Sequence, residues 1–188
     1  MGKVILGVTI SLDGFAEDRD GSVGALYPDL DALHDTEVLR ESQRNTGSVV
    51  MAWKEFAMGE DNPDSDWWAG NYEYQVPIFV FGSKTPQKHP KETDSLTFTF
   101  VKEGIRSAIQ KAKVAAGERD VTIIGSASTT KLCLNAGLVD ELHFDIIPIF
   151  LGGGFRPFDD IDTTIKLERI ETVELPAGRT HLVFRVVK

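Results

Sequence analysis

Short apolar runs alternate along the chain with stretches in which apolar residues recur at helical spacing. The runs rich in Val, Ile and Phe have the length of buried or half-buried strands, and they span 3–12, 48–51, 77–81, 97–101, 121–125 and 141–149. The helical spacing covers 30–45, 102–116 and 128–136. Two alternating stretches, 165–175 and 180–187, flank Pro176-Ala177-Gly178 and predict a C-terminal β-hairpin.

Strands that alternate with helices, followed by a hairpin, predict an α/β fold. We expect a mixed, mostly parallel sheet flanked by helices, with the hairpin at an antiparallel edge. Residues 17–31 and 57–75 contain glycines and acidic residues and are predicted to be loops. The acidic cluster Glu60, Asp61, Asp64 and Asp66 reads as part of a solvated loop, because a metal site would need ligands that converge. The histidines have no metal-ligand spacing, so no metal is predicted.

Length and composition narrow the function. A chain of 188 residues predicts a single domain over 1–188. Its 20 basic and 29 acidic residues give a net charge of −9, which argues against nucleic acid or an anionic membrane surface as a partner. The one cysteine, Cys133, lies in a predicted helix and is expected to be a buried thiol. The N-terminus lacks a signal-peptide pattern, so a cytoplasmic protein is expected.

Residues 121–154 form the most informative segment. A β-branched run breaks at Gly125-Ser126, a helix opens at Ala127-Ser128-Thr129, and a second strand ends at a triple glycine. Unpaired N–H groups and the positive end of the helix dipole converge at such a corner, which favours a phosphate-bearing ligand. The alternative is an ordinary βαβ crossover whose glycines serve only tight turns.

Two motifs in this chain resemble a known family. Ala136-Gly137-Leu138-Val139-Asp140-Glu141-Leu142, followed by Pro148-Ile149-Phe150-Leu151-Gly152-Gly153-Gly154, is similar to the end of the riboflavin-biosynthesis reductase domain, which has the dihydrofolate reductase fold. Ser11-Leu12-Asp13-Gly14-Phe15 is similar to the opening motif of that group. The resemblance implies an NADPH-dependent reductase of a small heterocyclic or ribosylamino-pyrimidine substrate, and commonly a homodimer.

The resemblance also implies which corners bind the cofactor. They are Ala52-Trp53, Ser83-Lys84 and the segment Gly125-Ser126-Ala127-Ser128-Thr129. The family usually has Gly-Arg at the first corner and Gly-Gly at the last, so Ala52-Trp53 and Gly125-Ser126 are departures. An indole cannot replace the charge of arginine, which puts NADPH preference in question. Members that reduce the ribosylamino-pyrimidine typically have Glu where this chain has Ile124, which weakens a strict riboflavin assignment.

Hydride transfer to a C=N or C=O bond also needs a proton. Asp13, after the first strand, and Asp145, on a mostly apolar strand, are the predicted catalytic carboxylates. Substrate contacts are expected from Ser11, Gly14 and Phe15, and from Asp35, which lies near the pteridine-binding carboxylate of folate reductases. Each acid has an alternative role as a cap or surface residue. A non-catalytic or repurposed small-molecule-binding protein with a degenerate cofactor site is the competing class, and a dimerising scaffold is a third.

Overall fold

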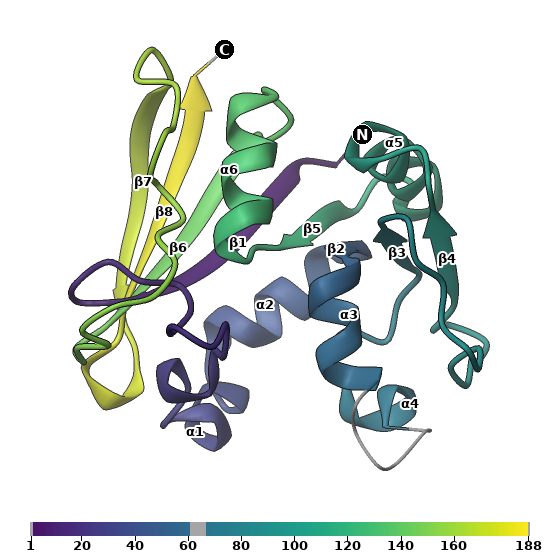
Figure 1. Ribbon diagram of the computed structural model, residues 1–188, viewed down its shortest axis with the longest axis horizontal. Coiled ribbons are helices and arrows are strands. Elements are labelled where there is room, and N and C mark those ends of the chain that lie inside the picture. The colour runs from purple at the N-terminus through teal and green to yellow at the C-terminus, as the bar shows by residue number, and fades with distance from the viewer. Residues whose placement is uncertain (1, 61–66, 188) are drawn as a thin grey trace. The chain divides into compact units, whose positions relative to one another are not determined.

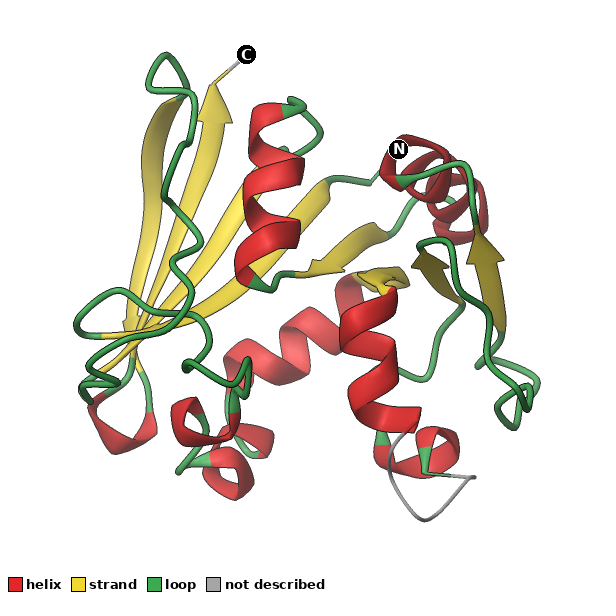
Figure 2. Ribbon diagram, viewed as in Figure 1, coloured by secondary structure: helices red, strands yellow, loops and turns green. Residues whose placement is uncertain are grey.

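The computed structural model describes residues 2–60 and 67–187, and Figures 1 and 2 trace the strands and helices along the chain. Within these residues, eight strands form one mixed sheet. The chain divides into two compact units: unit 1 comprises residues 1–3 and 42–124, and unit 2 comprises residues 4–41 and 125–188. The single domain expected over 1–188 stays a prediction. No helix among the described residues has both the length and the apolar character needed to cross a bilayer.

Unit 1 is built on parallel strands. In sheet order they are β4 (Phe98–Val101), β3 (Ile78–Phe81), β2 (Thr46–Ala52) and β5 (Asp120–Ile124). β2 is buried at nearly every position, as its apolar run predicts for a central parallel strand. The helix predicted over 102–116 is α5 (Ile105–Ala116), whose apolar face is buried and packs mainly on β2.

An aromatic cluster forms the core beside β2. Phe56 is 1% exposed and stacks on Trp68, with ring centroids 5.4 Å apart, while Phe98 and Phe100 meet Phe56 edge-on. Phe56 lies on α3 (Trp53–Glu60) and Trp68 on α4 (Trp68–Asn71). The prediction of a loop over 57–75 is therefore wrong for 57–60 and 68–71, which belong to α3 and α4. Its glycines suggested turns, but burial of the aromatic rings favours helices there.

Unit 2 combines parallel and antiparallel strands. In sheet order they are β1 (Val4–Ser11), β6 (Glu141–Ile147), β8 (Thr180–Val187) and β7 (Lys166–Glu174). β1 and β6 are parallel, and β8 is antiparallel to both β6 and β7. β7 and β8 form the predicted C-terminal hairpin, which turns through η2 (Pro176–Gly178). The helix predicted over 128–136 is α6 (Ala127–Asn135), which packs on β1. The predicted α/β class, with its mostly parallel sheet, helices and terminal hairpin, is confirmed.

The single helix expected over 30–45 is instead two helices, α1 (Leu30–His34) and α2 (Glu37–Asn45). The side chain of Thr36 causes the break. Its Oγ1 donates to the carbonyl of Leu33 and accepts from the N–H of Leu39, so Thr36 caps the second helix. Threonine is a favoured N-cap residue, and this signal outweighs the continuous apolar stripe.

A buried arginine ties the hairpin to the start of α1 in unit 2. The side chain of Arg179, beside η2, is 0% exposed, and its guanidinium donates to both carboxylate oxygens of Asp29 at 2.9 and 2.7 Å. It also donates to the carbonyl of Leu26, in η1 (Gly24–Leu26), at 2.8 Å. The hydrogen bonds from Arg179 hold the pKa of Asp29 below its usual value, although desolvation opposes this.

We expect Asp29→Asn to lower the free energy of unfolding at pH 7 by about 3–5 kcal/mol, because the buried guanidinium loses its counter-charge. The pKa of Asp29 is lower in the folded chain than in the unfolded chain. Its contribution is thus fully present above the unfolded pKa and is lost as pH falls through the folded pKa. Urea unfolding at several pH values should show the gap between wild type and variant shrinking below about pH 4.

Asp31→Asn is the matched control for this experiment, because Asp31 is an exposed carboxylate in the first turn of the same helix. An equal loss of stability in both variants, or a gap that does not depend on pH, would contradict the role given to Asp29.

Candidate functional site

The loop after β1 is held together by Asp13. Its Oδ1 accepts from the hydroxyl of Ser11 at 2.6 Å and from the N–H of Leu151 at 3.1 Å, and its Oδ2 accepts from the N–H of Gly152 at 2.8 Å. The hydrogen bond from Ser11, and after it those from the two N–H groups, hold the pKa of Asp13 below its usual value. A carboxylate in this state has no proton to deliver near neutral pH. Its observed role is to tie the opening motif to the glycine segment.

The other predicted substrate residues of this loop lie beside Asp13. The N–H of Phe15 donates to the Ser11 hydroxyl at 3.0 Å, and Gly14 has a φ of +89°, which favours glycine. The guanidinium of Arg156 lies 4.2 Å from the centre of the Phe15 ring. The opening motif and the segment after β6, far apart in sequence, thus meet at the carboxyl end of β1.

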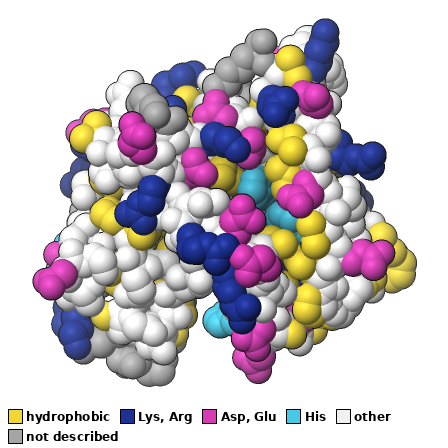
Figure 3. All heavy atoms as spheres, turned by 180° about the vertical axis from the view of Figure 1, so that it is seen from behind, with side chains coloured by type: hydrophobic (Ala, Val, Ile, Leu, Met, Phe, Trp, Pro, Cys, Tyr) yellow, Lys and Arg dark blue, Asp and Glu magenta, His cyan; other side chains and the backbone are white. Residues whose placement is uncertain are grey.

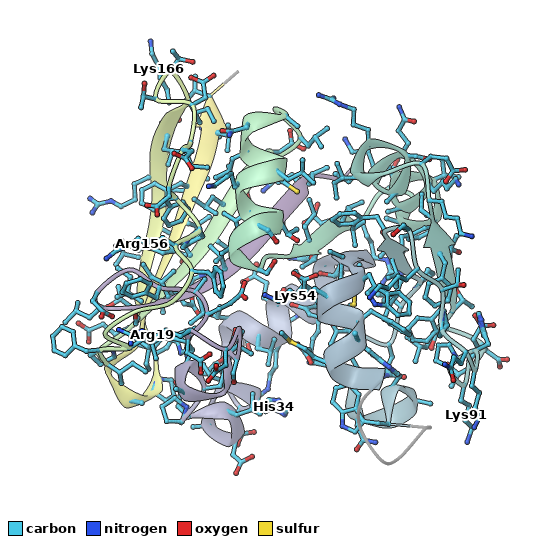
Figure 4. All side chains as sticks on the ribbon, viewed as in Figure 1. Arg19, His34, Lys54, Lys91, Arg156 and Lys166 are labelled. Atoms are coloured by element: carbon cyan, nitrogen blue, oxygen red, sulfur yellow. The ribbon has the colours of Figure 1, made fainter. Side chains whose placement is uncertain are left out.

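The glycine segment also packs closely on Glu17. Gly154 has a φ of +141°, and a Cβ there would collide with the carbonyl oxygen of Glu17. The N–H of Phe155 donates to that same oxygen at 3.0 Å. Arg19 donates to the carbonyl of Gly152 at 3.1 Å, and Figure 4 shows Arg19 and Arg156 on this side of unit 2. Of the three glycines, Gly154 therefore allows close backbone approach, whereas Gly153 makes room for the side chain of Arg19.

The N-terminus of α6 has the geometry expected of an anion site, but the protein's own carboxylate lies there. Ser126 is the N-cap, with a φ of −75°, and its hydroxyl accepts from the N–H of Thr129. A Cβ at Gly125 would lie 2.6 Å from the carbonyl of Gly7, so glycine is needed at that position. The N–H of Ala127 donates at 3.0 Å to Glu17, whose side chain is among the most deeply buried. A phosphate approaching Ala127 would meet this carboxylate.

A groove of about 720 Å³ lies beside the N-terminus of α6 in unit 2. It is lined by two predicted cofactor residues, Ala127 and Ser128, and also by Lys131, Leu132 and Arg156. The ammonium of Lys131 is paired with Asp160 at 2.9 Å. The groove thus combines an apolar wall with charged side chains.

In unit 1, three predicted cofactor residues meet. Trp53, Ser83 and Lys84 line a groove of about 670 Å³ together with Thr85, Pro86, Gln87 and Lys88. Gly82 has a φ of +151°, and a Cβ there would lie 3.0 Å from the Cβ of Trp53. The Trp53 ring packs against Phe56 and Phe100, with centroid distances of 5.3 and 6.4 Å. Ala52 ends β2 directly before Trp53. The sequence missed Lys88, although its charge so near Lys84 was a readable signal.

Asp145 belongs to a buried network that the sequence did not reveal. Its Oδ1 lies 2.6 Å from Nδ1 of His181, and its Oδ2 accepts from Arg179 at 3.4 Å. Asp35, by contrast, lies at the C-terminal end of α1, with an exposed side chain paired to Arg40. The deeply buried carboxylate next to α1 is Asp29.

No group of three His, Cys, Asp or Glu side chains among the described residues is placed to hold a metal ion. The acidic residues Asp61, Asp64 and Asp66 of the predicted cluster lie outside the described residues.

Comparison with known proteins defines the class. The model of the RibD C-terminal domain matches residues 2–179, and the chain therefore belongs to the RibD C-terminal domain family. The Bacillus subtilis protein YyaP is 26% identical over 187 residues, covering 97% of this chain and 94% of the relative.

Solved structures share the fold. A putative riboflavin biosynthesis protein from Shewanella sp. PV-4 superposes with a TM-score of 0.73 at 20% identity, covering 99% of both chains. Dihydrofolate reductase from Enterococcus faecalis, in complex with NADP(H), gives a TM-score of 0.64 at 14% identity, covering 100% of this chain and 98% of the other. The dihydrofolate reductase-like fold is confirmed. Membership of the RibD C-terminal domain family supports an oxidoreductase.

We expect Glu17→Gln to have two opposite effects. The charge at the N-terminus of α6 is lost, which should lower the free energy of unfolding by about 0.5–2 kcal/mol. The same change should strengthen the binding of inorganic pyrophosphate, because the repelling carboxylate is gone. Urea unfolding and calorimetric titration measure the two effects. Asp20→Asn, an exposed acid in the same loop, is the control. Unchanged pyrophosphate binding would show that Glu17 does not oppose phosphate binding at the N-terminus of α6.

Proposed function

We propose that the protein is an NADPH-dependent reductase of a small heterocyclic or ribosylamino-pyrimidine substrate, of the riboflavin-biosynthesis type. The observation that carries the proposal is the groove of unit 1, where Trp53, Ser83 and Lys84 meet a second lysine, Lys88. Two ammonium groups and two neighbouring hydroxyls suit an adenosine 2′-phosphate, and an indole offers a flat surface for a base.

This groove also offsets a departure from the family pattern. Trp53 stands where the family usually has arginine, and the ring lines the groove while packing on the aromatic core. Lys84 and Lys88 supply positive charge from the segment after β3 instead. Bound there, the reduced nicotinamide nucleotide would supply a hydride. Such chemistry and a single buried cysteine both fit a cytoplasmic enzyme.

The substrate side is proposed for unit 2, at the carboxyl ends of β1 and β6. Ligands of open α/β sheets bind outside the carboxyl ends of the strands. Ser11, Gly14 and Phe15 lie there, in a loop made rigid by Asp13. The description of the Shewanella protein as a putative riboflavin biosynthesis protein supports the substrate class. Members that reduce the ribosylamino-pyrimidine typically have Glu where this chain has Ile124. Other small heterocycles therefore also remain candidates for the substrate.

A repurposed small-molecule-binding protein is the second candidate, and the position of Glu17 favours it. A carboxylate on the N–H of Ala127 stands where a dinucleotide of this fold would place phosphate. Binding of a nicotinamide nucleotide decides between the two functions.

Lys84→Ala is expected to weaken NADPH binding by about 10-fold, or ~1.4 kcal/mol, with a smaller effect on NADH, because only NADPH carries the 2′-phosphate. Quenching of tryptophan fluorescence measures both affinities, since Trp53 lines the groove. Lys102→Ala removes an exposed lysine of unit 1 outside the groove and should change neither affinity. If wild type binds neither nucleotide at millimolar concentration, the reductase proposal fails.

The proposed assembly is a homodimer. β8 lies between β6 and β7, so β7 is an edge strand of the sheet. Leu167 and Ile170 on β7 are nearly half exposed, and an exposed strand edge is a template for pairing with another copy.

Light scattering at roughly 10–50 μM should give the mass of a dimer. Replacing Ile170 with Lys should shift the mass toward the monomer, while Lys166→Ala, on the same strand, should not. A monomeric wild type at these concentrations would contradict the proposal.

A further inference from the structure

A histidine and a carboxylate form a tightly coupled pair on the sheet of unit 2. His181 of β8 is directly opposite Asp145 of β6 in the antiparallel register, and Nδ1 lies 2.6 Å from Oδ1 of Asp145. The side chains are 9% and 21% exposed, respectively. Because the carboxylate accepts the Nδ1 proton, it fixes the ring orientation and leaves Nε2 to exchange protons with its surroundings.

Arg179 holds the carboxylate of this pair in place. Its guanidinium donates to Oδ2 of Asp145 at 3.4 Å while Asp29 and the carbonyl of Leu26 fix its other side. Burial alone would lower the pKa of Arg179, but the hydrogen bonds with Asp29 and the charges of Asp145 and Asp29 outweigh it and raise the pKa. Arg179 thus holds Oδ2 of Asp145, while Oδ1 of the same carboxylate lies beside Nδ1 of His181.

The pair lies on the face of the sheet that carries the predicted substrate residue Ser11. Asp145 is in register with Thr9 on β1, and Ser11 follows on the same face of that strand, next to the opening motif. The hydroxyl of Tyr27 donates to that of Thr9 at 3.2 Å on the same face. Histidine side chains reach the surface on the face shown in Figure 3, between hydrophobic and acidic ones.

The charged and titratable groups that face His181 come from several elements. The ring of His143 on β6 meets the ring of His181 edge-on, with centroids 5.5 Å apart. A carboxylate oxygen of Glu141 lies 3.5 Å from Nε2 of His143. Glu171 of β7 pairs with Val183, on the same face as His181. The remaining charged and titratable groups around His181 are those described above: Asp145, Arg179, Asp29 and Tyr27.

We propose that His181 donates the proton of the proposed reduction, and that Asp145 and Arg179 are its positioning residues. This inference rests on the proposed function. A hydride, two electrons and one hydrogen nucleus, adds to carbon of the C=N or C=O bond of the substrate. The Nε2–H bond of protonated His181 breaks, an N–H or O–H bond forms on the substrate heteroatom, and the neutral imidazole takes its next proton from water. Asp13, the other predicted catalytic carboxylate, accepts hydrogen bonds from Ser11, Leu151 and Gly152 in the loop after β1.

The test uses NADPH with 5-amino-6-(5-phosphoribosylamino)uracil and with 7,8-dihydrofolate as probe substrates, between pH 5 and 9. His181→Gln should lower kcat by about 10²–10⁴-fold and remove the fall in rate near neutral pH, with little change in KM. Asp145→Asn should lower kcat less and shift that fall, because the imidazolium loses its counter-charge. His34→Gln, an exposed histidine of the same unit, should leave both kcat and the pH profile unchanged.

A second readout needs neither turnover nor a variant. In ¹⁵N NMR of wild-type protein, His181 should carry its proton on Nδ1 in the neutral form, and its Nε2 signal should move when a probe substrate is added with NADP⁺. His34 should not respond. This measurement decides the matter if His181→Gln does not fold.

The outcomes separate the two proposals. An active wild type whose His181→Gln variant keeps its kcat and pH profile overturns the role of His181 and leaves the reductase function standing. A silent Nε2 signal under saturating ligands overturns it equally. A wild type that neither binds NADPH nor reduces either probe overturns the reductase function, and the inference falls with it.

Discussion

A permanent positive charge buried in unit 2 constrains much of that unit. The guanidinium of Arg179 is wholly removed from water, a state that is tolerated only when every donor and the charge itself are satisfied. Asp29 therefore has to lie at the start of α1, Leu26 has to turn its carbonyl inward, and Asp145 has to face the hairpin turn. One residue thus couples the last hairpin to the first helix and fixes the acceptor that orients His181.

A second constraint acts at the N-terminus of α6. A buried helix end leaves N–H groups without partners inside the helix, and the protein supplies Ser126 and Glu17 to satisfy them. Glu17 is brought there by the pairing of its backbone with Phe155, which the glycine at position 154 makes possible. The residues that resembled a ligand-binding motif therefore also stabilise the fold. A phosphate at this corner has to compete with an intramolecular partner.

Local signals predicted most of the fold. The run 77–81 is apolar along its length, and Gly117 and Gly137 follow the helices they end, so these elements could be recognised from local sequence alone. The misses came from longer-range or competing effects. Residues 57–60 and 68–71 are helical where glycines suggested a loop, and the rings of Phe56 and Trp68 in these two helices stack on each other. The hydroxyl of Thr36 interrupts a stripe that looked continuous.

Local sequence signals predicted less of the candidate site than of the fold. Trp53, Ser83 and Lys84 follow strand ends and were grouped as cofactor residues by the family resemblance, and the structure brings them together in one groove. His181 could not be found that way, because its partner Asp145 is 36 positions earlier and the pairing depends on antiparallel register. In the proposed function, phosphate recognition rests on the side chains of Lys84 and Lys88 more than on the N-terminus of α6. Flexible point charges respond to charge more than to geometry and are screened by salt. If the proposed nucleotide binds, Lys84 and Lys88 would attract its phosphate in unit 1, whereas in unit 2 the N–H of Ala127 already donates to Glu17. The proposed binding therefore depends on the lysines of unit 1, because an internal carboxylate occupies the helix N-terminus that the sequence pattern favoured.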